Sequence, residues 1–273
     1  MATLTDAEIE RDLAFAIETA RDAGDRIKRL RASGRWEEPK LIGDIGDQAA
    51  DGYLQGIIRG RYPDDGLLSE ETADSAERLS RDRAWIVDPL DGTKEFGAGR
   101  DDWAVHVALT VGGRCALGAV ALPSLGQVLW GVTVEGRESA GMDGEGNPAR
   151  GDSPSPATPR IAVSRSHTPP WVESFADKLG GAELRPWGSA GFKVSRLLVG
   201  EADLYVHKVG LKEWDTCAPE TVARALGWHV CKLRGEEHAY NQANPKNHEL
   251  VICRPAERER VLAAIEASGA LAD

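Results

Sequence analysis

The beginning of the chain carries apolar side chains at helical spacing. They recur about every three or four residues, at Ile9, Leu13, Ile17, Ala20, Ile27 and Leu30. Thr5 precedes this run and Glu8 stands three residues further on, which is the pattern of a capping box, and Gly34 follows the run. The pattern predicts an amphipathic helix of about seven turns that begins after Thr5.

A second run of apolar residues predicts another helix. Its members are Ala50, Leu54, Ile57 and Ile58. We expect this helix to begin near Asp47 and to stop before the turn residues at 63–66. Asp47 is then expected at the amino end of the helix, where its carboxylate could face a functional site.

From residue 104 onward the pattern changes from helical to alternating. Between 105 and 111 the odd positions are valine or leucine, and the even positions are smaller or polar. Gly112-Gly113 turns the chain into two further apolar runs, at 116–122 and 128–134. This arrangement predicts an antiparallel meander.

Residues 142–159 contain Asp-Gly-Glu-Gly-Asn-Pro and Ser-Pro-Ser-Pro and almost no apolar side chains. This composition predicts a mobile loop, and the loop is the best candidate for a boundary between two parts of the chain. Beyond it strands and helices alternate, with strands expected at 161–164, 204–207, 230–233 and 250–253 and helices at 189–199, 219–226 and 256–267, besides one capped by Thr168-Pro169. The predicted organisation is therefore an α+β half at 1–141 and an α/β half at 160–273.

The composition narrows the class of protein. A chain of 273 residues with 41% hydrophobic residues can bury a substantial core. Its formal charge of −11 argues against a binding surface for a nucleic-acid polymer, although a small anionic substrate fits if metal ions invert the local field. The four cysteines suggest neither a disulfide framework nor a zinc site, and the amino end has no basic leader or apolar run. We expect a cytoplasmic protein that uses no cofactor apart from metal and binds no membrane.

The segment 85–96, Trp-Ile-Val-Asp-Pro-Leu-Asp-Gly-Thr-Lys-Glu-Phe, is the most informative motif. Residues 84–87 predict a buried strand that Pro89 ends, because proline cannot extend the hydrogen-bond ladder. Asp88 and Asp91 are then expected at the carboxyl end of this strand. Their carboxylates can converge on one hard cation, with the backbone carbonyl of Leu90 as a further oxygen ligand.

Gly92 and Thr93 follow these acids and present amide hydrogens that can hold phosphate oxygens. An isolated Asp-Gly pair would more simply be a turn, with Asp88 as a strand-end cap. Further acids at comparable places favour the site: Glu70 and Glu71 end another apolar stub, and Asp215 stands at a predicted helix start. His106 and His207 are expected to be packed histidines, because magnesium prefers oxygen ligands.

These motifs resemble those of the inositol monophosphatase superfamily of lithium-sensitive, magnesium-dependent phosphatases. The resemblance rests on Asp-Pro-Leu-Asp-Gly-Thr at 88–93, Glu-Glu at 70–71 and Trp-Asp-Thr-Cys-Ala-Pro at 214–219, in that superfamily's order and spacing. Within it the chain is most similar to the CysQ-like 3′(2′),5′-bisphosphate nucleotidases, those of mycobacteria in particular. The resemblance implies a layered α/β/α/β/α sandwich of the inositol monophosphatase and fructose-1,6-bisphosphatase type.

The resemblance also implies roles for the acids. Glu70, Asp88 and the Leu90 carbonyl would bind the magnesium ion that activates water, and Asp88, Asp91 and Asp215 would bind the ion beside the leaving oxygen. Thr93 would orient the attacking water while Asp47 accepts the threonine proton, and Glu70 would help to take the proton from the water. Glu71 would touch a third ion or support the other ligands. The resemblance thus implies two or three magnesium ions, with lithium as an inhibitor.

Substrate choice depends on fewer residues. Lys193 lies one turn into the helix expected to begin at Ser189, so its ammonium group could meet a second phosphate while the Gly188 and Ser189 amides approach a nucleotide. Inositol monophosphatases typically carry no lysine at the position of Lys193, and Lys208 stands where they carry a glutamate that contacts inositol. Both departures favour a bisphosphate, although either lysine could equally be a solvated surface charge.

We therefore predict a phosphomonoesterase that removes the 3′-phosphate of 3′-phosphoadenosine 5′-phosphate in sulfur assimilation, giving AMP and phosphate. The related sulfated nucleotide, 3′-phosphoadenylyl sulfate, is a possible second substrate. The alternatives are an inositol monophosphatase, a fructose-1,6-bisphosphatase, or a catalytically silent sensor of metal or nucleotide. The expected partner is a small phosphate substrate, and the expected assembly is a monomer or homodimer.

Overall fold

The computed structural model describes residues 4–166 and 168–271. Their helices are α1 (Asp6–Ala32), α2 (Pro39–Arg61), α3 (Thr93–Gly97), α4 (Trp171–Lys178), α5 (Ala190–Leu198), α6 (Glu213–Ala225) and α7 (Arg258–Ala267), with 3-10 turns η1 (Ala76–Ser80) and η2 (Pro255–Glu257). Their strands are β1 (Gly66–Ser69), β2 (Arg83–Asp91), β3 (Ala104–Val111), β4 (Arg114–Leu122), β5 (Gln127–Val132), β6 (Ser139–Asp143), β7 (Arg160–Ser164), β8 (Glu183–Trp187), β9 (Leu204–Lys212), β10 (His229–Cys231) and β11 (Lys246–Cys253).

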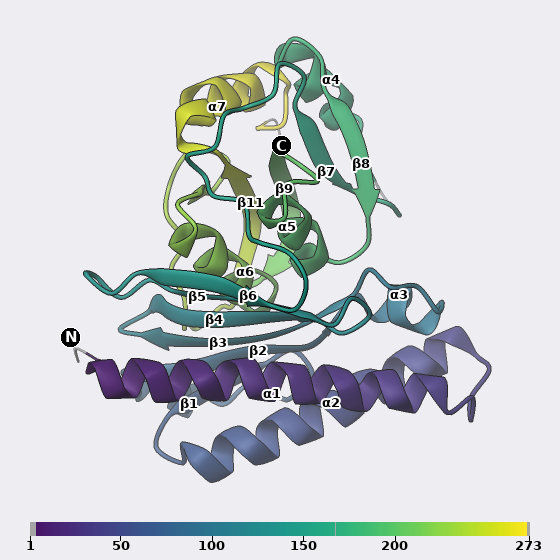
Figure 1. The fold of residues 1–273 in the computed structure, drawn as a ribbon, viewed down its shortest axis with the longest axis vertical. Helices are drawn as coiled ribbons and strands as arrows, with labels where there is room; N and C mark the ends of the chain where they lie inside the picture. Colours follow the sequence, from purple (N-terminus) through teal and green to yellow (C-terminus); the bar gives the residue numbers. More distant parts are fainter. Residues whose placement is uncertain (1–3, 167, 272–273) are drawn as a thin grey trace.

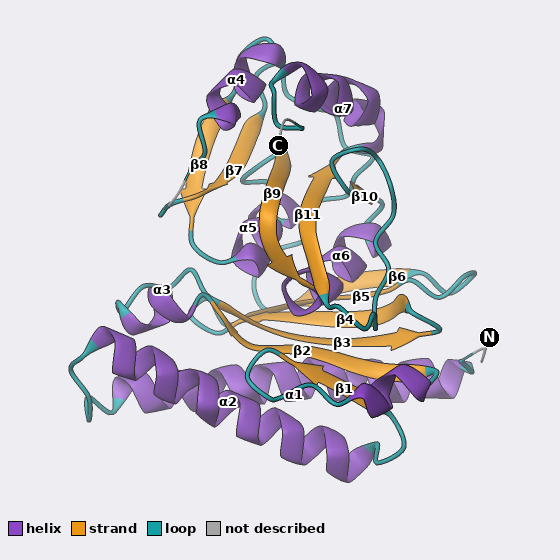
Figure 2. Cartoon of the chain, turned by 180° about the vertical axis from the view of Figure 1, so that it is seen from behind, coloured by secondary structure: helices purple, strands orange, loops and turns teal. Residues whose placement is uncertain are grey.

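The described elements form five layers (Figure 1). The first sheet has the order β1-β2-β3-β4-β5-β6, and the second has the order β10-β11-β9-β7-β8. Helices α1 and α2 cover the outer face of the first sheet, α5 and α6 lie between the two sheets, and α4 and α7 cover the far face of the second (Figure 2). This arrangement confirms the α/β/α/β/α sandwich that the sequence resemblance implied.

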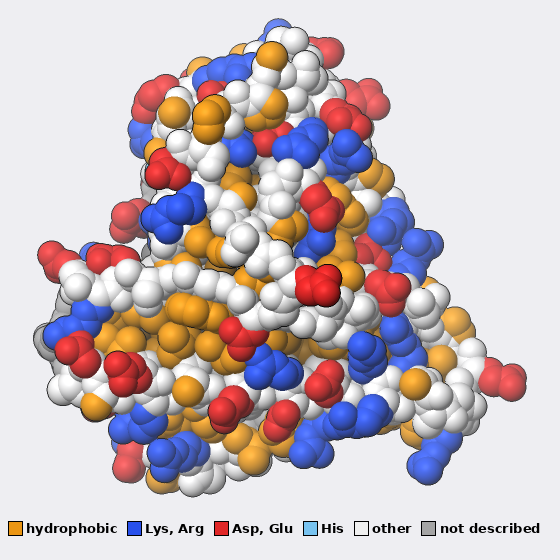
Figure 3. Space-filling model, in the orientation of Figure 1, with side chains coloured by type: hydrophobic (Ala, Val, Ile, Leu, Met, Phe, Trp, Pro, Cys, Tyr) orange, Lys and Arg blue, Asp and Glu red, His pale blue; other side chains and the backbone are white. Residues whose placement is uncertain are grey.

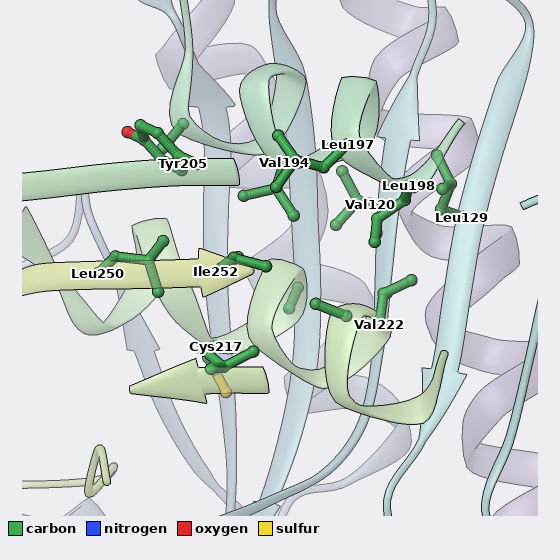
Figure 4. Packing of buried hydrophobic residues seen from close by; sticks show 14 of the residues in the cluster. Val120, Leu129, Val194, Leu197, Leu198, Tyr205, Cys217, Val222, Leu250 and Ile252 are labelled. Carbon is green, nitrogen blue, oxygen red and sulfur yellow. The ribbon is translucent and has the colours of Figure 1, made fainter. Parts of the chain in front are cut away.

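The first helix and the meander follow their sequence signals closely. Helix α1 has the predicted capping box, in which the Thr5 side chain accepts from the Glu8 amide while the Glu8 side chain accepts from the Thr5 amide. Strands β3, β4 and β5 pair antiparallel in sequence order, as predicted. Alternate β3 residues enter different buried clusters: Val105 and Val107 join the cluster of α1 and α2, whereas Ala104 and Ala108 join the cluster of α5 and α6. Figure 4 shows part of the second cluster, with Val194 of α5 and Val222 of α6.

Strand β2 differs from its prediction, because it runs through Pro89 to Asp91. Its pairing with β3 shifts register between the Asp88–His106 pair and the Asp91–Ala104 pair. An irregularity of this kind interrupts the ladder, so the amide hydrogen that proline lacks is not required there. Asp88 and Asp91 therefore lie within the end of the strand rather than beyond it.

Helix α2 begins earlier than predicted, at Pro39, so Asp47 lies inside the helix and not at its amino end. Gly43 and Gly46 lie in the part of the helix that was not predicted, and both pack closely against neighbouring residues. A Cβ added at Gly43 would lie 2.8 Å from Cγ2 of Thr93, and one at Gly46 would lie 2.7 Å from the Phe96 ring. The extra turns therefore bring α2 directly against α3, and Asp47 with it.

Three smaller expectations need correction. Strand β6 reaches Asp143 and so overlaps the start of the loop predicted at 142–159. Helix α4 begins at Trp171 without a side-chain cap, because the Thr168 hydroxyl donates instead to the Ser164 carbonyl at 2.8 Å. Strand β8 was not predicted at all. It is a short strand of mixed exposure with a proline inside it, which weakens any period-two signal.

The division of the chain at 142–159 stays a prediction. One buried cluster takes side chains from both sides of that segment, such as Leu68 and Leu122 on one side and Leu197 and Ile252 on the other.

On the face seen in Figure 3, basic side chains are interspersed with acidic ones. Within the described ranges, no helix combines the length and apolarity needed to cross a membrane.

Candidate active site

Carboxylates from the two halves of the chain meet between the sheets. Asp88 and Asp91 come from the end of β2, and Asp215 comes from the first turn of α6. Each offers one oxygen, and these oxygens all lie within 4.8 Å of one another. The structure thus brings together three of the predicted metal ligands.

Asp88 is fully buried at the centre of this group. Its Oδ1 accepts from the Leu90 amide at 3.1 Å, and its Oδ2 finds no hydrogen-bond partner within residues 4–166 and 168–271. Burial, followed by the charges of Glu70 and Asp91, raises the pKa of Asp88 well above its usual range. A buried carboxylate under repulsion needs a proton or a cation to balance its charge.

Asp91 is the acid whose charge the protein itself balances. Its carboxylate accepts from the Ala190 amide at 3.1 Å and the Gly191 amide at 2.5 Å, at the amino end of α5. Nε2 of His106 lies 3.3 Å from Asp91, while Nδ1 of His106 lies 3.0 Å from the Trp214 carbonyl. Burial acts to raise the pKa of Asp91, but His106 and the amide hydrogen bonds outweigh it and lower that pKa. His106 is packed, as expected, and it supports an acid of the site.

Thr93 and Asp47 form the contact that the resemblance implied. Oγ1 of Thr93 donates to Oδ2 of Asp47 at 2.7 Å and lies 3.2 Å from the Leu90 carbonyl oxygen. The approach of α2 to α3 makes this contact possible. Burial raises the pKa of Asp47 to about 7, although the hydrogen bond from Thr93 acts in the opposite direction.

Glu70 and Glu71 follow β1 but meet different neighbours. Desolvation, together with the charges of Asp215 and Asp47, raises the pKa of Glu70 to about 8, although part of its side chain stays open to solvent. Glu71 is also exposed, and desolvation followed by the charge of Asp51 on α2 raises its pKa. Glu70 therefore interacts electrostatically with the acids of the site, while Glu71 interacts mainly with α2.

The predicted substrate-binding residues lie beside the acids. Gly92 has a positive φ of 98°, and a Cβ added there would lie 3.0 Å from Cβ of Ser189, the residue that caps α5. Lys193 is buried on α5, where its ammonium group donates to the Gly188 carbonyl and lies 5.5 Å from the centre of the Tyr205 ring. Burial lowers the pKa of Lys193 to about 8, and the charges of Asp91 and Glu95 act against that shift.

The Gly188 and Ser189 amides were predicted to approach a nucleotide, but they have partners within the protein. In the structure Gly188 N donates to the Asp102 side chain at 2.5 Å, and Ser189 N donates to the Asp102 carbonyl at 3.2 Å. Arg165 forms an ion pair with the same Asp102 carboxylate at 2.6 Å. These amides therefore serve to hold the loop before α5 and do not point freely at a ligand. Sequence reasoning missed Asp102 and Arg165, which tertiary contacts alone reveal.

Tyr205, whose ring centre lies 5.5 Å from the Lys193 ammonium group, also lines a hollow of about 380 Å³. Its walls combine apolar and aromatic side chains with a few polar groups, including Trp171, Pro169, Tyr205, Ser164 and Lys208. This mixture is typical of pockets for flat organic groups. Lys208, which the sequence singled out, thus lies on the wall of this hollow and not among the acids.

The residues present fit a hard cation. The donors in the cluster are oxygens, which magnesium prefers, and the buried Oδ2 of Asp88 has no hydrogen-bond partner in the described part of the chain. Burial raises the pKa of Asp215 to about 7, with the charge of Asp91 next in importance. A bound cation would relieve both effects.

The raised pKa values predict how stability depends on pH. Asp47, Glu70 and Asp215 have pKa values of about 7 to 8 in the folded protein, against about 4 in an unfolded chain. The stability that their protonation contributes is complete below the unfolded pKa and is lost as the pH rises through the folded pKa. The Tm of chelated protein is therefore expected to fall between about pH 5 and about pH 8.

Added magnesium should raise the Tm more at about pH 8 than at about pH 6, because fewer protons must be displaced. Differential scanning calorimetry with chelator and with magnesium measures both effects. An equal gain at the two pH values would contradict the assignment of these carboxylates to the metal site.

The comparisons with known proteins identify the class. The family model described as the inositol monophosphatase family matches residues 8–270, so the chain belongs to this family of metal-dependent phosphatases. A 3′-phosphoadenosine 5′-phosphate phosphatase of Mycobacterium leprae is 37% identical over 265 residues, which cover 93% of this chain and 90% of that protein.

Solved structures agree with the fold. CysQ of Bacteroides thetaiotaomicron, a bacterial member of the inositol monophosphatase family, superposes with a TM-score of 0.76 at 27% identity, over 89% of this chain and 97% of that chain. Inositol monophosphatase II of Staphylococcus aureus superposes with a TM-score of 0.77 at 21% identity, over 91% of both chains. The family and fold predicted from the sequence are confirmed.

Proposed function

We propose that the chain hydrolyses the 3′-phosphate of 3′-phosphoadenosine 5′-phosphate, with magnesium as its metal and AMP and phosphate as products. The observation that carries the proposal is the 37% identity, along nearly the whole chain, to a protein named for this activity. The site geometry supports it through three features: the cluster of acids, the buried ammonium group of Lys193, and a partly aromatic hollow on whose wall Tyr205 lies. A nucleotide with two phosphates presents groups that match all three features.

The acids of the site would hold the metal ions that this reaction uses. When bound, magnesium supplies the positive charge that shields phosphoryl oxygens and activates water. Asp88, Asp91, Asp215, Glu70 and the Leu90 carbonyl would hold two ions, and Glu71 a third ion or none.

The remaining residues position the reactants. Thr93 keeps its hydroxyl hydrogen directed at Asp47, which leaves an oxygen lone pair free to orient the attacking water. Glu70 helps to take the proton of that water, since a bound cation would favour the ionised form of its carboxylate. The Gly92 and Thr93 amides hold the reacting phosphate, and Ser189 and Lys193 contact the rest of the substrate.

Phosphate release from a panel of substrates tests this proposal. The panel contains 3′-phosphoadenosine 5′-phosphate, its sulfated analogue, 3′-AMP, inositol 1-phosphate and fructose 1,6-bisphosphate, each with magnesium and with chelator. We expect the highest kcat/KM for 3′-phosphoadenosine 5′-phosphate and no release with chelator. Faster hydrolysis of inositol 1-phosphate or of fructose bisphosphate would replace the proposed substrate. No release from any substrate would favour a silent sensor.

Lithium is expected to inhibit the enzyme at millimolar concentration. Lithium and magnesium are both small cations that prefer hard oxygen ligands, and the site offers several carboxylates. The measurement is a lithium titration at limiting magnesium, with sodium at equal ionic strength as the control. Activity that stays constant across the lithium titration would argue against the proposed metal site.

A further inference from the structure

Two cysteines that are far apart in the sequence face each other between β4 and α6. The Sγ atoms of Cys115 and Cys217 lie 3.3 Å apart, and the Cys115 thiol also lies 3.7 Å from the Cys217 carbonyl oxygen. Neither is in a disulfide. The two backbones approach closely here, since a Cβ added at Gly118 would lie 3.0 Å from Cα of Ala218. Figure 4 shows Cys217 in the packed layer that separates the sheets.

The two sulfur atoms differ in their access to solvent. Cys115 is partly exposed and lines a hollow of about 400 Å³, together with Glu220, His238 and Tyr240. Cys217 is buried behind it. The residues that line this hollow include none of the acids described above. A small oxidant that enters it therefore meets Cys115 first, without passing through the active site.

The other cysteines do not share this arrangement. Cys231 and Cys253 lie in the cluster on the far side of the second sheet. The register of β10 and β11 places Cys231 opposite Val251 and Cys253 opposite His229, so the two cysteines do not pair across the strands. Both are buried. They provide matched controls within the same chain.

We propose that Cys115 and Cys217 form a reversible disulfide when the protein meets a hydroperoxide. The Cys115 sulfur attacks the peroxide oxygen, which gives a sulfenic acid and releases water or an alcohol. The Cys217 sulfur then attacks the Cys115 sulfur, which forms the S–S bond and expels hydroxide that leaves as water with the Cys217 proton. Two thiols are oxidised and one peroxide is reduced, and a dithiol reverses the reaction.

The disulfide acts on the metal site through α6. Cys217 lies two residues after Asp215, whose carboxylate accepts from the Lys212 amide at 2.7 Å. Closing the sulfur gap from 3.3 Å to about 2.05 Å draws the first turns of α6 toward β4 by about 1 Å. Magnesium requires near-ideal ligand positions, so this displacement weakens its binding. The effect on activity rests on the proposed function, whereas the disulfide itself does not.

Peptide mapping tests the disulfide without any substrate. Full-length protein is treated with hydrogen peroxide, the remaining thiols are alkylated, and the protein is digested without reductant for mass spectrometry. We expect a cross-linked pair of peptides that contain Cys115 and Cys217, which disappears after dithiothreitol. The same product is expected from Cys253→Ser, and none from Cys115→Ser or Cys115→Ala. Absence of the cross-link in the wild-type protein, or its formation between other cysteines, would overturn the proposal.

The magnesium dependence of the same samples tests the consequence. Displacement of groups that orient a metal ligand costs about tenfold to a hundredfold in metal affinity. We therefore expect oxidation to raise the half-saturating magnesium concentration of the wild-type protein and of Cys253→Ser by about tenfold, with full recovery after dithiothreitol. Cys115→Ser should keep its reduced value after peroxide. Equal inactivation of Cys115→Ser, or a cross-link that leaves magnesium dependence unchanged, would overturn the link to the metal site.

Discussion

Replacing Asp88 with asparagine is expected to lower turnover by at least about two to three powers of ten. Asp88 is fully buried and one of its oxygens has no hydrogen-bond partner among the described residues, so the amide removes charge from the proposed metal site. Steady-state kinetics with 3′-phosphoadenosine 5′-phosphate and saturating magnesium measures the loss. A variant that keeps more than about a tenth of the wild-type rate would remove Asp88 from the bridging position.

A separate measurement distinguishes a damaged site from a damaged fold. Burial, followed by repulsion from Glu70 and Asp91, raises the pKa of Asp88, and a neutral amide avoids both costs. The metal-free Asp88→Asn variant should therefore be at least as stable as the metal-free wild type. The rise in Tm that magnesium causes should be lost. Asp64→Asn makes the same chemical change at an exposed position and should leave both turnover and the magnesium effect unchanged. A fall in Tm of the metal-free variant would assign Asp88 a structural role.

The regular elements were predictable where one local signal determined them. The capping box of α1 and the alternation of β3 each specify an element without reference to distant residues. The start of α2 was not predictable, because the helix there depends on close packing of Gly43 and Gly46 against Thr93 and Phe96. These two residues are far away in the sequence. The passage of β2 through Pro89 likewise depends on the register shift against β3.

The residues of the site likewise fall into those that a local sequence signal predicted and those that it did not. Asp88 and Asp91 are close in sequence, so their spacing alone suggested that they converge. Asp215 comes from the other half of the chain, and only the resemblance to a family associated it with them. The sequence assigned no role to Asp102 or Arg165, because their importance lies in a tertiary contact with the loop before α5. Sequence spacing thus predicts metal ligands that lie on one strand, whereas residues that come from other layers can be recognised only once the fold is known.

Replacing Lys193 with alanine is expected to change substrate preference. If its ammonium group holds the 5′-phosphate, kcat/KM for 3′-phosphoadenosine 5′-phosphate should fall by about tenfold to a hundredfold, with a much smaller loss for 3′-AMP. Burial lowers the pKa of Lys193 to about 8, so the wild-type preference for the bisphosphate should also decline as the pH rises above about 8. Lys40→Ala, at a surface position that is 78% exposed, is the matched control.

The kinetics of Lys193→Ala also distinguish two roles for this buried lysine: binding a phosphate of the substrate, or balancing the charge of the acids. In the structure its ammonium group donates to the Gly188 carbonyl, and the negative charges of Asp91 and Glu95 act to raise its pKa. If Lys193→Ala weakened both substrates equally and raised the magnesium requirement, the lysine would balance the charge of the acids and not that of a phosphate. The preference for a nucleotide would then depend on the hollow beside Tyr205, where Lys208 is the remaining lysine of the two that the sequence singled out.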